Sequence, residues 1–172
     1  MSYFVSAIII LIAFLSVIAL FDEVREAIKA RRRKANKSES EELVARAAGM
    51  NGQLYKMSTD AFQQLVIHVY EGIGYRVKAL TVGKDCALIL EQNGVYALMI
   101  YKNHQWPMSC EILEICYHHK TKMMLDAMLF LSIGGFNESA CKWSKGQSDV
   151  KLINEDGFVD LCKEMAKPLS RS

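Results

Sequence analysis

Residues 129–165, LFLSIGGFNESACKWSKGQSDVKLINEDGFVDLCKEM, are the stretch that decides the fold class. They open with an apolar run and a glycine turn, after which Asn137 precedes a short helical pattern from Glu138. A second strand pattern, VKLIN, leads directly into a closing amphipathic segment, GFVDLCKEM. Short strands that alternate with helices are typical of α/β proteins. This stretch therefore predicts two strands, each followed by a helix.

The preceding residues predict a helix, three strands and another helix. Ser58, Thr59 and Asp60 form an N-cap cluster before an apolar helical face that Gly72 and Gly74 end. Three strand patterns follow, YRVKAL, CALIL and VYALMIY, the last two joined by the hairpin-type turn QNG. The sequence WPMS then interrupts the chain before a helix that begins near Cys110. The whole order predicts an α/β fold with a central mixed β-sheet flanked by helices.

The amino-terminal segment has the length and composition of a membrane span. Residues 3–21 are apolar except for Ser6 and Ser16, and a helix needs about 20 such residues to cross a bilayer. A cleaved signal peptide is disfavoured, because no Lys or Arg precedes the run and no clear small-residue cleavage site follows it. We expect an uncleaved single transmembrane helix.

A basic segment follows the predicted anchor, and it contains Arg25, Lys29, Arg31, Arg32, Arg33, Lys34 and Lys37. Lys and Arg in short flanks stay on the cytoplasmic side, so the amino terminus is expected outside and the remaining chain in the cytoplasm, at a bacterial inner membrane. Orientation alone explains the segment. Two alternatives are contacts of residues 31–37 with anionic lipid head groups or with nucleic-acid phosphates.

The chain divides into an anchor and a single globular domain. We assign residues 1–22 to the anchor, 23–50 to the basic segment and a short helix, 51–168 to the α/β domain and 169–172 to a tail.

The charge of the globular part differs from that of the amino-terminal part. The first 37 residues hold seven of the 21 Lys and Arg and three of the 19 Asp and Glu, which leaves 14 Lys and Arg and 16 Asp and Glu for the rest. This balance of −2 counts against strong nucleic-acid binding by the folded part.

The cysteines and histidines indicate no cofactor. Five cysteines, an odd number with no Cys-x-x-Cys pair, indicate reduced thiols rather than a disulfide framework. Cys110, Cys116, His118 and His119 share one predicted helix, with His104 before it, but their spacing matches no zinc motif. We therefore interpret them as buried thiols and surface histidines.

Two segments carry a family resemblance: residues 57–77, MSTDAFQQLVIHVYEGIGYRV, and the closing residues 129–165. Over residues 57–165 the chain resembles the Mrr-type catalytic domain of the restriction-endonuclease-like superfamily. Such nucleases place carboxylates and a lysine around a divalent metal, which activates water and polarises the phosphate. The resemblance implies ligands at three positions where this chain has Gln63, Ile89 and Ile100. Of the implied site, only Lys102 matches.

An isoleucine has no lone pair for a metal, so we expect Ile89 and Ile100 to be core residues. Asp85 is expected in the turn before the second strand, about 13 Å from position 89, because a strand advances about 3.3 Å per residue. Glu91 lies two residues beyond Ile89 on the same strand face, so these two carboxylates are the candidates for a rearranged site. Lys102 is either a phosphate contact or a side chain that extends from the strand end to water.

These observations leave three hypotheses for the function. The leading one is a catalytically inactive, membrane-anchored nuclease-like domain that serves as an interaction component of an inner-membrane assembly, with protein partners. Mobile-element, conjugation, secretion and phage-defence assemblies are the types considered. The second is an active membrane-tethered DNA endonuclease that uses Mg²⁺ with Lys102 and Asp85 or Glu91. The third is a non-catalytic DNA tether that binds through residues 31–37.

Overall fold

The computed structural model describes residues 41–50, 52–82 and 85–166, except for the side chains of residues 81–86. Contacts within the chain group residues 40–172 into one unit, separate from residues 1–39. Within the described ranges, no helix combines the length and the apolar character that a membrane span requires. The predicted anchor and the basic residues Arg31 to Lys37 lie outside the described residues.

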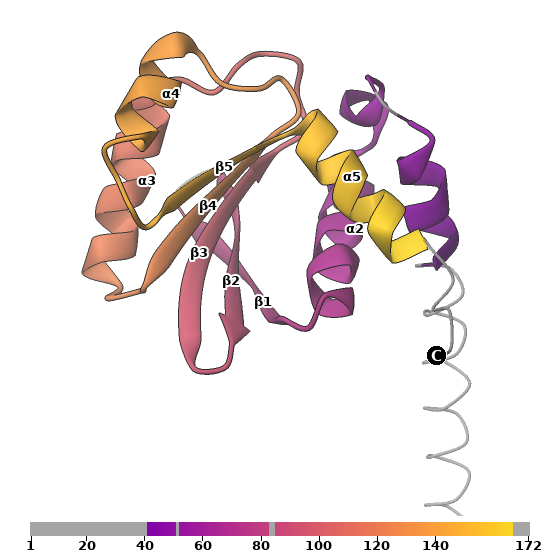
Figure 1. The fold of residues 1–172 in the computed structure, drawn as a ribbon, viewed down its shortest axis with the longest axis horizontal. Coiled ribbons are helices and arrows are strands. Elements are labelled where there is room, and N and C mark those ends of the chain that lie inside the picture. The colour runs from indigo at the N-terminus through magenta and orange to yellow at the C-terminus, as the bar shows by residue number, and fades with distance from the viewer. Residues whose placement is uncertain (1–40, 51, 83–84, 167–172) are drawn as a thin grey trace, which may run out of the picture. The chain divides into compact units, whose positions relative to one another are not determined.

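A five-stranded mixed sheet forms the centre of the domain (Figure 1). Its strands lie in chain order: β1 (Arg76–Val82), β2 (Asp85–Gln92), β3 (Val95–Lys102), β4 (Ala127–Ser132) and β5 (Val150–Asn154). The first three strands are antiparallel, whereas β3, β4 and β5 run parallel. The predicted central mixed sheet is therefore confirmed.

Helices cover both faces of this sheet (Figure 1). The helices α3 (Cys110–Lys122) and α4 (Glu138–Ser144) lie on one face. On the other face lie α2 (Thr59–Gly72) and α5 (Glu155–Ala166), and the short helix η1 (Leu54–Lys56) precedes α2. Residues 41–48 form a further helix, as the sequence predicted for this region.

Local sequence explains where these elements begin and end. Ser58 is the N-cap of α2, and its hydroxyl accepts a hydrogen bond from the Ala61 amide at 3.2 Å. Asn137 does the same for α4 through the Ala140 amide at 2.8 Å. Between β2 and β3, Asn93 and Gly94 have φ of 55° and 81°, as a tight two-residue hairpin turn requires.

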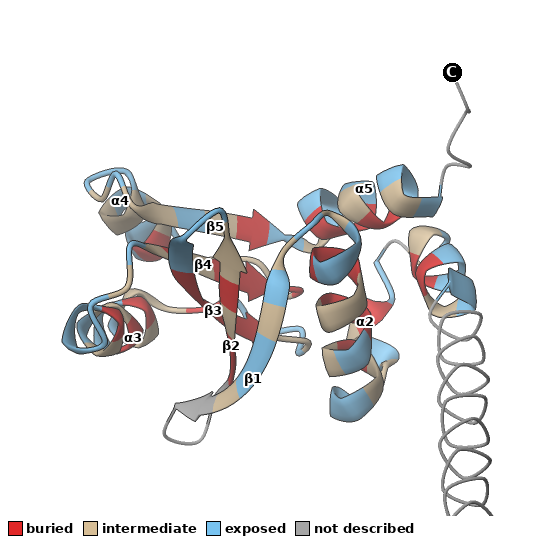
Figure 2. Ribbon diagram, turned by 90° about the horizontal axis from the view of Figure 1, so that it is seen from below, coloured by how far each residue is buried: buried red, intermediate tan, exposed pale blue. Residues whose placement is uncertain are grey.

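The core consists of two apolar layers, one on each face of the sheet (Figure 2). Alternation along β3 divides its side chains between the layers. Met99 and Tyr101 pack with the α2 and α5 side, where Phe62 and Phe158 lie. Leu98 and Ile100 pack with the α3 and α4 side, and that layer also contains Phe130, Met108, Leu113 and Ala140.

Candidate functional site

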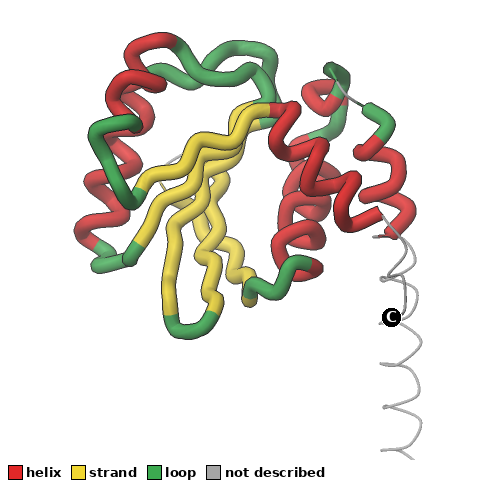
Figure 3. Tube along the Cα trace, in the orientation of Figure 1, coloured by secondary structure: helices red, strands yellow, loops and turns green. Residues whose placement is uncertain are grey.

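Three parallel strands end in register at one edge of the sheet. Lys102 at the end of β3 pairs with Ser132 of β4, which pairs with Asn154 of β5. Loops gather at this edge (Figure 3). In open α/β sheets, ligands bind outside the carboxyl ends of the parallel strands. This edge, which holds the predicted Lys102, is therefore the candidate site.

Lys102 extends from the strand end and is half-buried. By alternation it lies on the same face of β3 as Ile100 and Leu98. A lysine placed there supplies a positive charge that attracts an anionic group to the edge. The structure therefore places the one retained residue of the implied nuclease site where it can meet a phosphate.

Ile100 is the residue that limits the chemistry of this edge. Its side chain is fully buried, and it belongs to the same apolar layer as Phe130 and Met108. The expectation that Ile100 is a core residue is confirmed. Because the side chain offers no oxygen, the strand position two residues before Lys102 gives a divalent cation no ligand.

The structure corrects the predicted position of Asp85. We expected Asp85 in the turn before the strand, but β2 begins at Asp85 itself. β2 and β3 are antiparallel, so the start of β2 lies toward the same edge of the sheet as Lys102, but their pairing ends at Ala87 and Ile100 and does not reach Asp85. The side chain of Asp85 is outside the described part of the chain. The prediction of a turn was wrong because the pairing of Asp85 with Val82 of β1 makes Asp85 the first residue of the strand.

Ile89 lies farther along β2, away from this edge. It pairs with Leu98, four residues from Lys102, and is half-buried rather than part of either core layer. The expectation that Ile89 is a core residue is therefore not met. Ile89 is also not the residue of β2 that lies opposite Lys102.

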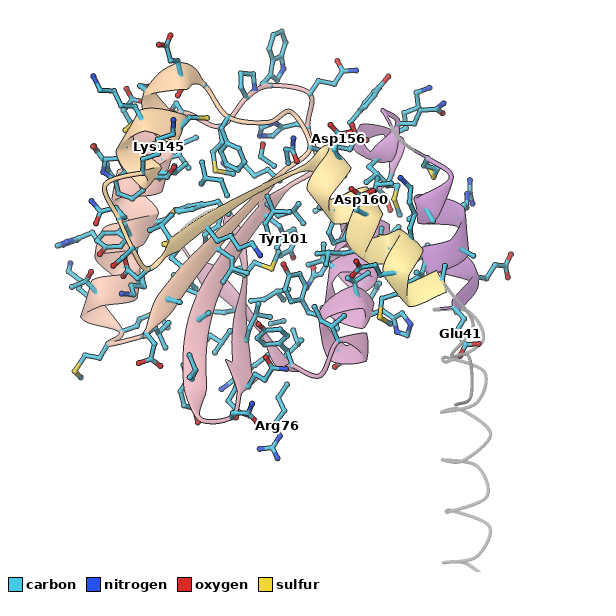
Figure 4. All side chains as sticks on the ribbon, in the orientation of Figure 1. Glu41, Arg76, Tyr101, Lys145, Asp156 and Asp160 are labelled. Atoms are coloured by element: carbon cyan, nitrogen blue, oxygen red, sulfur yellow. The ribbon has the colours of Figure 1, made fainter. Side chains whose placement is uncertain are left out.

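Glu91 belongs to the opposite end of the sheet. Its carboxylate accepts a hydrogen bond from the Gly94 amide at 3.2 Å and forms an ion pair with Arg76 at 3.4 Å. Figure 4 shows Arg76 at the end of the sheet remote from α4. These contacts stabilise the hairpin turn and leave Glu91 far along β2 from Lys102.

Gln63 lies in the first half of α2. The adjacent Phe62 packs against Tyr101, with ring centroids 6.1 Å apart, and against Phe158 at 5.8 Å. This aromatic group holds the amino end of α2 beside the sheet. A glutamine there offers a neutral amide oxygen instead of a carboxylate, so it attracts a metal cation only weakly.

The family can be assigned on this geometry together with the match of the sequence. Residues 54–162 match the Mrr catalytic domain, described as a restriction endonuclease, over more than half of the chain. The chain belongs to the Mrr-type restriction endonuclease family. The matched residues run from η1 to α5 and include every strand of the sheet.

Similarity to solved structures adds little to the family assignment. The crystal structure of a protein of unknown function, AF1548, matches this chain with 15% sequence identity and a TM-score of 0.44. The match covers 52% of this chain and 54% of that protein. The chain thus spans about half the length of that protein. A comparison with curated proteins finds no match.

Two residues of this Mrr-type domain escaped the sequence analysis. Ser132 is fully buried, and its hydroxyl has no hydrogen-bond partner among the described residues. Trp106 lies in the loop after β3 and is 77% exposed. Ser132 ends the apolar strand β4 and Trp106 follows the apolar strand β3, but an apolar pattern shows neither the burial of a terminal serine nor the exposure of a loop tryptophan.

The remaining predicted residues lie apart from the edge or serve other contacts. His104 and His118 are exposed, Cys116 is buried, and the Cys110 thiol donates to Glu114 at 3.6 Å. In the described part of the chain, no three His, Cys, Asp or Glu side chains are grouped as metal ligands. A cavity of about 300 Å³ lies at the amino ends of β4 and β5, the edge opposite Lys102.

Proposed function

We propose that this Mrr-type domain is catalytically inactive and acts by binding, as a membrane-anchored component of an inner-membrane assembly. The burial of Ile100 carries the proposal, because an apolar side chain occupies the strand position where the family resemblance implies a metal ligand. Gln63 supports it, since it supplies an amide where the resemblance implies a carboxylate. A divalent cation requires several oxygen ligands, and these two substitutions remove two of them.

The membrane part of the proposal rests on the sequence. The apolar run at residues 3–21 and the basic segment after it favour an anchor with the domain on the cytoplasmic side. A component of a mobile-element, conjugation, secretion or phage-defence assembly is the role that we propose. Its partners would include proteins of that assembly.

Incubation with DNA tests the loss of catalysis. The full chain, purified in detergent, is incubated with supercoiled plasmid and Mg²⁺ or Mn²⁺, beside Lys102→Ala and the control Lys122→Ala. We expect intact plasmid in every sample, with circular dichroism verifying that each protein is folded. Cleavage that Lys102→Ala abolishes and Lys122→Ala retains would overturn the proposal. Cleavage that persists in both variants would indicate a contaminating nuclease, to be removed before the test is repeated.

A second candidate, an active endonuclease, has one observation in its favour. β2 begins at Asp85 and the antiparallel β3 ends at Lys102, so one acidic residue and one lysine belong to the same edge of the sheet. Under this hypothesis, Asp85→Asn abolishes metal-dependent cleavage as completely as Lys102→Ala does. Glu91→Gln then serves as the control, because Glu91 is engaged in the β2–β3 turn.

A further inference from the structure

A group of exposed apolar residues lies at the end of β3 opposite the candidate site. It consists of Val95 and Tyr96, at the start of β3, and of Met123 and Met124, in the loop between α3 and β4. All are exposed, from 37% at Met123 to 90% at Met124. Single exposed apolar residues need no explanation, whereas a group of them indicates an interaction surface. We call these residues the apolar patch.

Hydrogen bonds hold the two parts of the apolar patch side by side. The Tyr96 amide donates to the Asp126 carboxylate at 2.7 Å, and the Asp126 amide donates to the Tyr96 carbonyl at 2.8 Å. The Met123 amide closes the end of α3 by donating to the His119 carbonyl at 3.0 Å. The backbone that carries the patch is therefore fixed by its own contacts, and the apolar side chains are exposed on a structured surface.

The charged groups at this end of the sheet do not select the occupant. The cations are Arg76, Lys78, Lys120, Lys122 and Lys151, and the carboxylates are Glu71, Glu91, Asp126 and Asp149. Glu91, Asp126 and Asp149 accept hydrogen bonds from other groups of the domain. Because the two signs are nearly balanced, the apolar side chains and not the charge determine what this surface binds.

The described chain begins toward this end of the domain. Figure 4 shows Glu41, the first described residue, toward the end where Arg76 lies and away from Asp156. Arg76 pairs with Glu91 of β2, and Glu91 pairs with Tyr96 of the apolar patch. The chain that precedes Glu41, which contains the predicted anchor, is therefore joined to the domain at the end that carries the patch.

We propose that the apolar patch inserts into the interface of the bilayer that holds the predicted anchor. The inference rests on the proposed function, because it requires residues 3–21 to be a membrane anchor. Residues 23–40 connect that anchor to the domain, and even fully extended they span at most about 65 Å. The bilayer surface is thus always near the patch, and a tethered contact needs little affinity of its own.

The residues of the patch suit lipid better than the groove of a protein partner. They lie on a hairpin turn and a helix end, and Figure 1 shows the β2–β3 hairpin projecting from the sheet. Methionine is unbranched and flexible, so it adapts to a fluid apolar layer. Tyrosine is enriched where membranes meet water, because its ring is apolar and its hydroxyl is polar. Next to Met123, the exposed Lys122 supplies a cation for lipid phosphates.

Quenching of a single indole by lipid tests this contact. The two tryptophans of the chain, Trp106 and Trp143, lie outside the apolar patch. In the full chain with Trp106→Phe, Trp143→Phe and Met124→Trp, the patch carries the only indole. The protein is reconstituted in vesicles of phosphatidylcholine with a minor share of phosphatidylglycerol. We expect its emission to be quenched when the phosphatidylcholine is brominated on its acyl chains, since bromine quenches an indole that it contacts.

The matched control keeps a native indole at the other end of the sheet. In Trp143→Phe the only indole is Trp106, which is 77% exposed in the loop after β3. We expect brominated lipid to leave the emission of Trp106 unchanged. Circular dichroism verifies that both proteins are folded.

Charge added to the apolar patch should remove the contact. Adding Val95→Asp and Met123→Asp to the Met124→Trp chain is expected to abolish most of the quenching, because a carboxylate is costly to insert into an apolar layer. Adding Ile115→Asp instead changes an exposed apolar residue of α3 outside the patch, and the quenching should remain.

Flotation of the vesicles reports anchoring separately from this contact. A chain that does not float with the vesicles would overturn the anchor and the inference together. A chain that floats, but whose Met124→Trp indole is quenched no more than Trp106, would overturn the inference alone. A blue shift of the Met124→Trp emission without quenching, which grows with the number of chains per vesicle, would assign the patch to contact between copies of the chain.

Discussion

Met124 adopts a backbone conformation that an L-amino acid rarely takes. It follows the end of α3 with φ of 54°, and its side chain is 90% exposed. The Leu125 amide donates to the Lys120 carbonyl at 3.2 Å, which closes the helix in the way that usually requires glycine at the position of Met124. The left-handed conformation therefore costs free energy that no burial of the side chain offsets.

Replacing this residue by glycine should stabilise the domain. We expect Met124→Gly to raise the free energy of unfolding by about 1 kcal/mol, because glycine adopts positive φ without strain. Met123→Gly is the matched control: its φ is −83°, so glycine there should lower stability. Thermal unfolding measures both. Equal melting temperatures for Met124→Gly and the parent would show that the turn is not strained.

Ile100 and Ile89 show what single residues do and do not predict. Both are apolar residues in strands, and their side-chain type alone predicted burial for each. Ile100 lies between β2 and β4 at the centre of the sheet and is fully covered, whereas Ile89 lies in β2, nearer the sheet edge, and is half-exposed. The burial of a strand residue depends on the neighbouring strands and on the helix that covers them, and the residue type alone specifies neither.

Elements were predicted more successfully, because capping and turn residues act locally. Ser58 begins α2, and the Asn93–Gly94 turn joins β2 to β3, where the sequence placed them. The start of β2 was misplaced, since the residues before Asp85, GK, look like the end of a turn while the pairing with β1 extends the strand to Asp85. A hydrogen-bonded partner, not the local sequence, fixes that boundary.

One ion pair links α3 to the start of β5. Lys120, which is 9% exposed, contacts the Asp149 carboxylate at 2.5 Å, and the Tyr117 hydroxyl donates to the same carboxylate at 3.2 Å. The hydrogen bond from Lys120 is the largest cause that lowers the pKa of Asp149. A carboxyl whose pKa is lower in the folded state stabilises that state above its unfolded pKa of about 3.9.

We expect Asp149→Asn to lower the free energy of unfolding at neutral pH by about 2 kcal/mol, since it weakens a hydrogen bond between charged groups. The difference from the parent should shrink as pH falls below about 4, because Asp149 in the parent then becomes protonated. Denaturant unfolding at several pH values measures this. Asp160→Asn is the control, because Asp160 and its partner Lys163 are both largely exposed. A pH-independent difference for Asp149→Asn would contradict the assignment.

At the scale of the whole molecule, the candidate edge is formed by the ends of β3, β4 and β5, which no single stretch of sequence contains. The sequence identified Lys102 because the residue itself is retained, and it identified Gln63 by its place after Phe62. It did not show that β2 begins at Asp85, because the pairing of β2 with β1 fixes that boundary, and it gave no indication of Trp106. Residues whose place depends on a single helix or strand could therefore be predicted from the sequence. Residues whose place depends on how two elements pack or pair could not.

If the edge is a nuclease site that has lost its ligands, restoring them should restore metal binding. We expect the double substitution Gln63→Glu and Ile100→Glu to destabilise the domain by about 3–5 kcal/mol, because it places a charge in the apolar layer around Phe130. Mn²⁺ or Mg²⁺ should recover part of this loss, about 1.4 kcal/mol at ten times the dissociation constant. Melting temperature with and without metal is the measurement.

Gln63→Glu with Leu98→Glu is the matched control, since Leu98 is equally buried on the same face of β3 but lies four residues from Lys102. It should lose as much stability and recover none with metal. Recovery confined to the Ile100 variant would mean that position 100 lies in metal-binding geometry with the other groups of this edge and that Ile100 blocks the site. Recovery in neither variant would show that this edge no longer has metal-binding geometry, and recovery in both would show that metal binding does not depend on position 100.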